Sequence, residues 1–158
     1  KGGCVFWSAG AQPPELLVSG EVVMATGWNG RFFNAIVGEG APLVQVWDGQ
    51  GLDYEYFVQV KGGPNDANGM AKKALAMMTS TEMLAGSAKY IAYAPWRKSS
   101  IAIMEAGEPW YKDGKTNMVP QMPTAPANTK NYFLVDPLYW ADNGTELGEK
   151  WEAMKAGL

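Results

Sequence analysis

The sequence predicts a mixed α/β fold, and three stretches carry this prediction. Tyr54–Val60 places tyrosine and valine at alternate positions, which is typical of a β-strand. Val22–Thr26 is a short apolar, β-branched run between glycines, which is typical of a buried strand. Near the C-terminus, Leu147, Trp151 and Met154 recur at helical spacing and predict an amphipathic helix. Strands and helices are therefore both expected in this chain.

The first part of the chain is predicted to contain short helices and strands. Prolines in the first turn predict a helix at Pro13–Val18, because the donors that proline lacks are not needed there. Gly27–Gly30 is expected to be a turn that cannot be helical, and Arg31–Val37 a short helix after it. Leu43–Trp47 is predicted to be a further strand.

The second part is predicted to be mainly helical. Met70–Thr79 has helical composition with an apolar stripe. A capping-box pattern then predicts a helix from Thr81 to about Tyr90. The other predicted helices are Arg97–Ala106, Asn128–Val135 and Thr145–Ala156, the last with Asp142–Thr145 as its N-terminal signal.

Composition restricts the classes of function. A chain of 158 residues can form one domain with a core. The net charge of −3 and the pI near 5.0 argue against nucleic acid, which requires a basic face. The sequence contains no histidine, which excludes histidine bases and most zinc sites, and the single Cys4 cannot form an internal disulfide. We therefore expect no nucleic-acid partner, no cofactor and no metal.

Two positions are candidates for ligand binding. Trp28 follows the predicted strand Val22–Thr26 at its C-terminal end, and ligands of open α/β sheets bind outside such ends. The alternative is a core tryptophan that caps the sheet. Glu55 lies among aromatic residues near the start of a predicted strand, so it needs a cationic partner or a solvated rim position. The alternative is a surface glutamate on an edge strand.

The case for an enzyme is poor. The sequence has no phosphate-binding loop, no nucleophile elbow and no histidine for a triad. A hydrolase that pairs Glu55 with Asp53 or Asp142 is one alternative, and it predicts turnover and a carboxyl group with a raised pKa. Two acids two residues apart on one strand are a weak signal for such a pair. We expect no catalytic residues.

Several blocks of the sequence resemble parts of a known protein family. Each block alone is a modest signal, but the ordered set is specific. These blocks are Ser8–Leu17, Ser19–Arg31, Val46–Gly49, Leu52–Val58, Lys61–Asn65, Tyr90–Pro95, Leu134–Asp136 and Tyr139–Gly144. The ordered set resembles the second half of the periplasmic spermidine/putrescine-binding proteins of ABC transporters and covers essentially the whole chain. The resemblance implies the C-terminal portion of a two-lobed, type II periplasmic-binding-protein-like α/β fold.

The same resemblance implies an organisation and partners. Residues 1–53 would belong to the second lobe, residues 54–100 would cross to the first lobe, and residues 101–158 would return and end in the C-terminal helix. The implied partners are a small cationic amine and an ABC permease in the membrane, and the implied location is the periplasm. A chain without most of one lobe exposes apolar surface, so we hypothesise that it self-associates.

The resemblance also implies ligand-binding residues. Trp28 matches a tryptophan that flanks the methylene chain of the polyamine, and Glu55 takes the place of a hinge aspartate that pairs with an ammonium group. Tyr93 matches a tyrosine of the cleft, and Trp140 stands where a glutamine contacts ligand in spermidine binders. Because glutamate replaces aspartate at position 55 and the aromatic neighbour has moved to Tyr54, a shorter diamine or another cationic amine is as plausible as spermidine.

A different class of function is also consistent with the aromatic residues. Seven tryptophans and seven tyrosines would also suit stacking of sugar rings, so a carbohydrate-binding protein or module is the main alternative. Glu55 discriminates between the two, because an amine requires its negative charge and a neutral sugar requires mainly hydrogen bonds.

Overall fold

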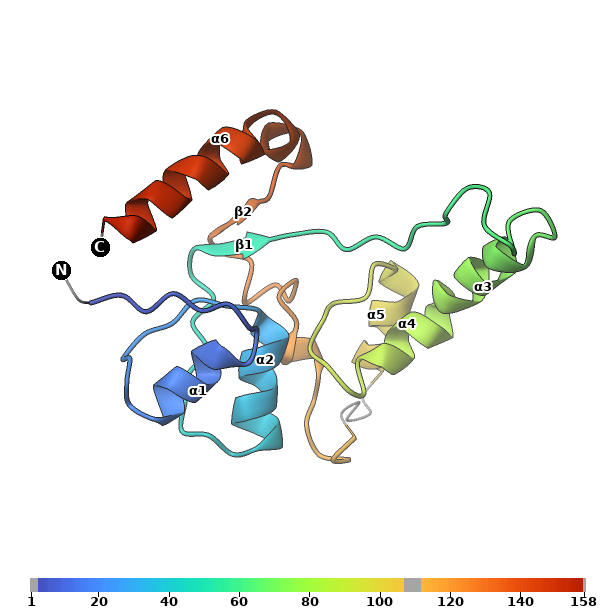
Figure 1. The fold of residues 1–158 in the computed structure, drawn as a ribbon. Helices are drawn as coiled ribbons and strands as arrows, with labels where there is room; N and C mark the ends of the chain where they lie inside the picture. Colours follow the sequence, from blue (N-terminus) through green and yellow to red (C-terminus); the bar gives the residue numbers. More distant parts are fainter. Residues whose placement is uncertain (1–2, 107–111, 158) are drawn as a thin grey trace.

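A computed structural model describes residues 3–106 and 112–157 of the chain (Figure 1). In this part the α-helices are α1 (Gln12–Val18), α2 (Asn29–Phe33), α3 (Met70–Met78), α4 (Thr81–Ser87), α5 (Lys98–Glu105) and α6 (Pro137–Ala156). A π-helical turn, η1 (Asn34–Gly38), continues α2, and a 3₁₀ turn, η2 (Val119–Gln121), follows α5. The strands are β1 (Gln50–Leu52) and β2 (Tyr132–Leu134).

Several predicted helices are confirmed within a few residues. Helix α1 has prolines in its first turn, and α3 ends one residue before the predicted Thr79. Helix α4 begins after Ser80, whose hydroxyl accepts the backbone N–H of Met83 at 3.4 Å. It ends at Ser87, three residues before the predicted end at Tyr90. Helix α5 lies within the predicted range.

Two helix starts differ from the prediction. Helix α2 begins at Asn29, so the prediction that Gly27–Gly30 cannot be helical is wrong for its last two residues. Trp28 is extended and precedes the helix, and its carbonyl accepts the N–H of Arg31 at 3.0 Å. Helix α6 begins at Pro137 instead of Thr145, because the side chain of Asp136 accepts the N–H groups of the following turn.

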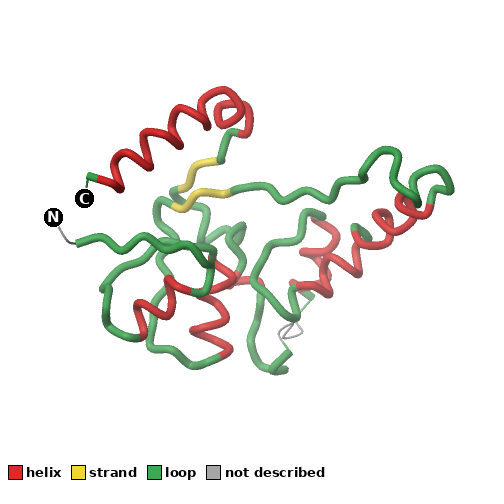
Figure 2. Tube along the Cα trace, in the orientation of Figure 1, coloured by secondary structure: helices red, strands yellow, loops and turns green. Residues whose placement is uncertain are grey.

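The three predicted strands do not form in the described residues. Val22–Thr26, Leu43–Trp47 and Tyr54–Val60 pair with no other strand in the described residues, and Figure 2 shows them as loop. The backbone of a strand needs a neighbour for its hydrogen bonds, and these stretches have none. Their apolar side chains are exposed as a result: Val23 is 93% exposed and Val44 is 88% exposed.

The strands that do form make a small parallel pair. Gln50 pairs with Tyr132 and Leu52 with Leu134, so β2 replaces the C-terminal part of the helix predicted at Asn128–Val135. The side chain of Gln50 donates to the carbonyl oxygens of Pro123 and Asn128, at 2.9 and 2.6 Å. These bonds hold the chain before β2 against β1. The prediction of a helix fails here because β2 is stabilised by pairing with β1, which is distant in the sequence. Gln50 and its partner Tyr132, for example, are 82 positions apart.

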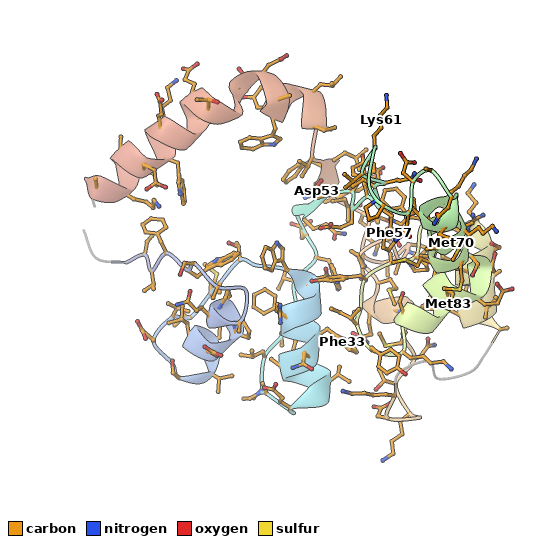
Figure 3. The ribbon with its side chains drawn as sticks, turned by 45° about the vertical axis from the view of Figure 1, so that its right-hand side comes forward. Phe33, Asp53, Phe57, Lys61, Met70 and Met83 are labelled. Carbon is orange, nitrogen blue, oxygen red and sulfur yellow. The ribbon has the colours of Figure 1, made fainter. Side chains whose placement is uncertain are left out.

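The core lies where α2 meets the second group of helices. Phe33 of α2 is buried with alanines and methionines from α4, the segment after α4, α5 and the segment around η2, namely Ala85, Ala88, Ala92, Met104, Met118 and Met122. Ser100 of α5 is buried and donates to the carbonyl of Thr81 at 2.8 Å, which fixes α5 against α4. Figure 3 shows Phe33 on the side of α2 that faces these helices. This packing places the segment after α4 directly opposite α2.

Two further parts of the chain extend away from this core. Beyond β1 the backbone runs out as a long extended segment to the loop before α3, and Figure 3 shows Asp53, Phe57 and Lys61 along it. Helix α6 lies apart from the other helices in Figure 1, and Trp151 makes an edge-to-face contact with Phe6, with ring centroids 5.2 Å apart. None of the helices in the described residues is both long and apolar enough to cross a membrane.

Candidate functional site

The start of α2 lies against the segment that follows α4. The side-chain amide of Asn29 donates to the carbonyl of Ala92 at 2.6 Å, which joins two segments 63 residues apart. Gly30 is buried at this contact, and a Cβ atom placed on it would lie 2.7 Å from Cε1 of Tyr93 and 2.9 Å from Cγ1 of Ile91. The tyrosine ring therefore lies directly on the backbone of α2. Any larger residue at position 30 would displace it.

Trp28 immediately precedes the same helix start. Its ring covers Gly10, where an added Cβ atom would be 2.5 Å from Cζ3 of the indole and 3.4 Å from Nε of Arg31. Trp7 packs edge-to-face against it, with ring centroids 5.5 Å apart. The side chain is nevertheless 56% exposed. Trp28 is thus oriented by its neighbours and still presents surface to a solute.

The extended segment after β1 brings a carboxylate to this region. Tyr54 and Tyr56 both lie beside Trp96, with ring centroids 4.7 and 6.2 Å from it. Glu55 lies between these two tyrosines in the sequence, and it is exposed.

The hydroxyl of Tyr93 responds to charges from two different elements. Burial is the largest cause of its raised pKa, and the negative charge of Glu55 raises that pKa further. The positive charge of Arg31 acts in the opposite direction and lowers it. Both charged groups are thus close enough to influence the same phenol. We call Trp28, Arg31, Glu55 and Tyr93 the Tyr93 cluster.

Trp140 is placed elsewhere in this chain. It lies on α6, where it contacts Tyr139 edge-to-face with ring centroids 6.1 Å apart and lies 3.9 Å from the Cβ position of Gly144. Within residues 3–106 and 112–157 no aromatic contact connects it to Trp28 or Tyr93. Of the residues that the resemblance implies, Trp28 precedes α2, Tyr93 contacts α2 at Gly30, and Glu55 acts electrostatically on Tyr93, whereas Trp140 lies on the separate helix α6.

Arg31 is a member of the cluster that the sequence analysis treated only as the start of a helix. No local signal in the sequence indicated a role for it. Its electrostatic effect on Tyr93 could not be found in this way, because Arg31 and Tyr93 are 62 positions apart in the sequence. Only the packing of Phe33 into the core places these elements together.

Two hollows in the surface lie away from the Tyr93 cluster. One of about 350 Å³ is bounded by η1, Leu43–Trp47 and η2, and its lining is apolar except for Gln45 and Gln121. The other, of about 300 Å³, lies between the extended segment and α3. The mainly apolar walls of the first hollow do not stabilise a charged solute, whereas the lining of the second includes the polar side chains of Gln59, Asn65 and Asp66. No group of three or more acidic or cysteine side chains in the described residues is placed to hold a metal ion.

Comparison with known proteins identifies relatives. The family described as bacterial extracellular solute-binding protein matches residues 1–124. A gamma-aminobutyric acid-binding protein of Pseudomonas aeruginosa is 37% identical over 151 residues, which cover 96% of this chain and 39% of that protein. The chain therefore spans about two fifths of the length of this relative.

Two solved structures have a similar fold. One is an ABC transporter substrate-binding protein from Bradyrhizobium japonicum USDA 110, with a TM-score of 0.69 and 25% identity, covering 94% of this chain and 43% of that one. The other is the periplasmic binding protein MotA from A. tumefaciens B6 in complex with glucopine, with a TM-score of 0.68 and 24% identity, covering 90% and 41%. The prediction of a periplasmic-binding-protein-like α/β fold is thus confirmed. The chain belongs to the family of bacterial extracellular solute-binding proteins.

Proposed function

We propose that this chain is part of the solute-binding component of an ABC importer, and that the Tyr93 cluster binds a small solute with an ammonium group. Membership of the solute-binding family supports the transport role. The observation that supports the choice of solute is that the negative charge of Glu55 acts on Tyr93, whose ring packs against the start of the helix that the exposed Trp28 precedes. The partners in this proposal are a permease in the membrane and a solute taken from the periplasm, and the protein catalyses no reaction.

The chemistry of the cluster fits an amine. A carboxylate that accepts an ammonium N–H forms a charge-assisted hydrogen bond, and aromatic faces attract the same cation. Putrescine and spermidine, which the sequence resemblance suggests, share this group with gamma-aminobutyric acid, which the name of the Pseudomonas relative suggests. The shared ammonium group is therefore the part of the solute that Glu55 is proposed to recognise.

The division of the chain between two lobes is a further part of this proposal. Residues 1–53 and 101–158 are assigned to the second lobe, and residues 54–100 to a segment that crosses to the first. The course of the chain supports this assignment, since Figure 1 shows the segment after β1 leaving the region of α1 and α2 for that of α3. The Tyr93 cluster takes Trp28 and Arg31 from one part and Glu55 and Tyr93 from the other. Trp140 would join the site only if α6 moved toward it.

The proposal is tested by titration of the 158-residue chain with amines and neutral sugars at millimolar concentration. Binding is followed by NMR at the indole N–H of Trp28, whose signal is assigned by Trp28→Phe. Amines should shift this signal, and Glu55→Gln should weaken their binding about tenfold, the effect of losing one charge-assisted hydrogen bond.

The matched control is Glu15→Gln, which makes the same change of charge on α1 and should leave amine binding unchanged. A response to neutral sugars with none to amines would contradict the proposal and favour the carbohydrate-binding alternative. Equal amine binding by the wild type and Glu55→Gln would also contradict it.

A further inference from the structure

We infer that the exposed segment Asp53–Lys61 is a pairing strand, and that its partner is the same segment of a second copy of this chain. The two segments would lie antiparallel about a two-fold axis that passes through Phe57. This inference goes beyond the proposed function and does not depend on the identity of the solute, because it concerns a surface between two copies of the chain.

The first observation is that the segment lacks partners for its backbone. Residues 53–61 are all exposed, and they lie on the stretch that runs from β1 toward the loop before α3 (Figure 1). No hydrogen bond joins a backbone N–H or C=O group of residues 55–59 to another described residue. An extended stretch with such free groups is a template for pairing with another strand.

The second observation is that both ends of the segment are held. Just before it, the carbonyl of Leu52 in β1 accepts the N–H of Val135 at 2.9 Å. Near its other end, the carboxylate of Asp66 accepts the N–H of Gly62 at 2.8 Å and a hydrogen bond from the side-chain amide of Gln59. The segment is therefore extended before a partner arrives, which reduces the entropy lost on pairing.

The third observation is that the segment is complementary to its own reversed copy. With Phe57 on the axis, Asp53 of each copy faces Lys61 of the other. The remaining facing pairs are Tyr54 with Val60, Glu55 with Gln59, and Tyr56 with Val58. Pairs of opposite charge and pairs of an aromatic with a β-branched residue stabilise antiparallel strands, and no like charges face each other in this arrangement. The sequence of the segment thus identifies a second copy as its partner.

The charged residues at the two ends are available for this pairing. Figure 3 shows Asp53 and Lys61 along the extended segment together with Phe57. The ion pairs among the described residues lie within α6 and include neither Asp53 nor Lys61. One carboxylate oxygen of Asp53 accepts the N–H of Tyr54 at 2.7 Å, which leaves the other oxygen for the lysine of the second copy.

The turn after Lys61 selects the register. Gly62 has a φ angle of +77°, so the extended conformation ends there. An axis at Val58 would place Glu55 opposite Lys61, but it would also place Tyr54 opposite Gly62, inside the turn. The axis at Phe57 keeps every facing position within the extended segment. Because the same surface is used by both copies, this interface closes at a dimer.

The experiment reverses the charges at the two ends of the segment. Asp53→Lys and Lys61→Asp each place like charges opposite each other twice in a dimer, so each variant alone should raise the dissociation constant of the dimer about tenfold. An equimolar mixture of the two variants should associate as the wild type does, because every facing pair in the mixed dimer is again an aspartate with a lysine. The double variant Asp53→Lys with Lys61→Asp should recover for the same reason.

Sedimentation equilibrium of the 158-residue chain measures these dissociation constants. Amide hydrogen exchange in residues 55–59 reports on the surface itself, and it should slow as the protein concentration rises. The matched controls are Glu21→Lys and Lys130→Asp, which reverse charges at exposed positions outside the segment and should leave association unchanged. Far-UV circular dichroism checks that each variant is folded.

Several outcomes would overturn the inference. A wild type that stays monomeric excludes the dimer. Association that neither charge variant weakens, or that leaves exchange in residues 55–59 unchanged, belongs to another surface. Weaker association of the two variants that their mixture does not recover means that Asp53 does not face Lys61. The proposed function is tested separately by the amine titration, so either proposal can fail while the other stands.

Discussion

The ring of Tyr93 lies on the backbone of Gly30, so close that an added methyl group would come within 2.7 Å of it. This contact joins the start of α2 to the segment after α4 and fixes the ring of Tyr93, whose phenol is influenced by the charges of Arg31 and Glu55. The absence of a side chain at position 30 is thus required by the packing of the site. The φ angle of this glycine lies outside the positive range, so the requirement is for space and not for an unusual backbone conformation.

The first prediction is that Gly30→Ala displaces Tyr93. The new methyl group has no room between the ring and Ile91, so we expect a loss of about 1–3 kcal/mol in the free energy of unfolding, as for other overpacked cores. The measurement is urea unfolding, combined with amine titration, in which binding should weaken. The control is Gly86→Ala in α4, where nothing lies within 4 Å and the change should be neutral or stabilising. Unchanged stability and binding in Gly30→Ala would show that the ring does not occupy this position.

The second prediction concerns the ionisation of Tyr93. We expect its hydroxyl to lose its proton at a higher pH than an ordinary tyrosine, whose pKa is about 10. Glu55→Gln should lower the pKa of Tyr93, and Arg31→Gln should raise it further, because these variants remove its two charged neighbours. The measurement is a pH titration of the tyrosine ring carbon by NMR, with Tyr93→Phe to assign the signal. Shifts in the same direction in both variants would contradict the arrangement of opposite charges.

This raised pKa has a consequence for stability. The folded chain keeps the Tyr93 proton at a pH where the unfolded chain has lost it, so the unfolded state binds fewer protons in that range. The contribution is fully present below a pH of about 10, the pKa of tyrosine in an unfolded chain, and is lost as the pH rises through the higher folded pKa. Urea unfolding across this alkaline range should show a steeper decline for the wild type than for Tyr93→Phe.

The third prediction is that Asp136, and not Asp142, controls the start of α6. The carboxylate of Asp136 accepts the N–H groups of Leu138 and Tyr139 at 2.9 and 3.3 Å, whereas Asp142 lies inside the helix. Asp136→Ala should therefore destabilise the first turn by about 1 kcal/mol, the usual effect of removing a helix cap. Amide hydrogen exchange in residues 138–141 measures this directly. Asp142→Ala is the control and should not increase that exchange.

The fourth prediction is self-association at tens of micromolar concentration. Val23 and Val44 are almost fully exposed on segments without strand partners, and such surfaces usually associate. Sedimentation velocity should show species larger than the monomer, and the double variant Val23→Lys with Val44→Lys should shift the population toward monomer. Val18→Lys changes a less exposed valine on α1 and should have a smaller effect. A wild type that sediments as a clean monomer would contradict the prediction.

Local signals in the sequence were sufficient for most of the helices. The prolines of α1, the apolar stripe of α3 and the serine that caps α4 all act on hydrogen bonds within a few residues, so their effect can be read without knowledge of the rest of the fold. The start of α6 was missed although its signal is also local. Asp136 caps the helix and Pro137 begins its first turn. The stretch Asp142–Thr145 carries a similar N-terminal helix signal, and it led to a predicted start at Thr145, eight residues after Pro137.

The strands and the candidate site depend on distant parts of the chain. Val22–Thr26 has the composition of a strand, but a strand also needs a neighbour, and composition does not supply one. The resemblance to a known family suggested Trp28, Glu55, Tyr93 and Trp140 as separate positions, and it gave Arg31 no role in ligand binding. The position of Tyr93 against α2 was decided by the burial of Phe33 among the helices α4 and α5, because this packing brings α2 against the segment that carries Tyr93. Side-chain pattern sets local conformation, whereas contacts between residues 60 or so positions apart, such as Asn29 and Ala92, arise only when the core closes.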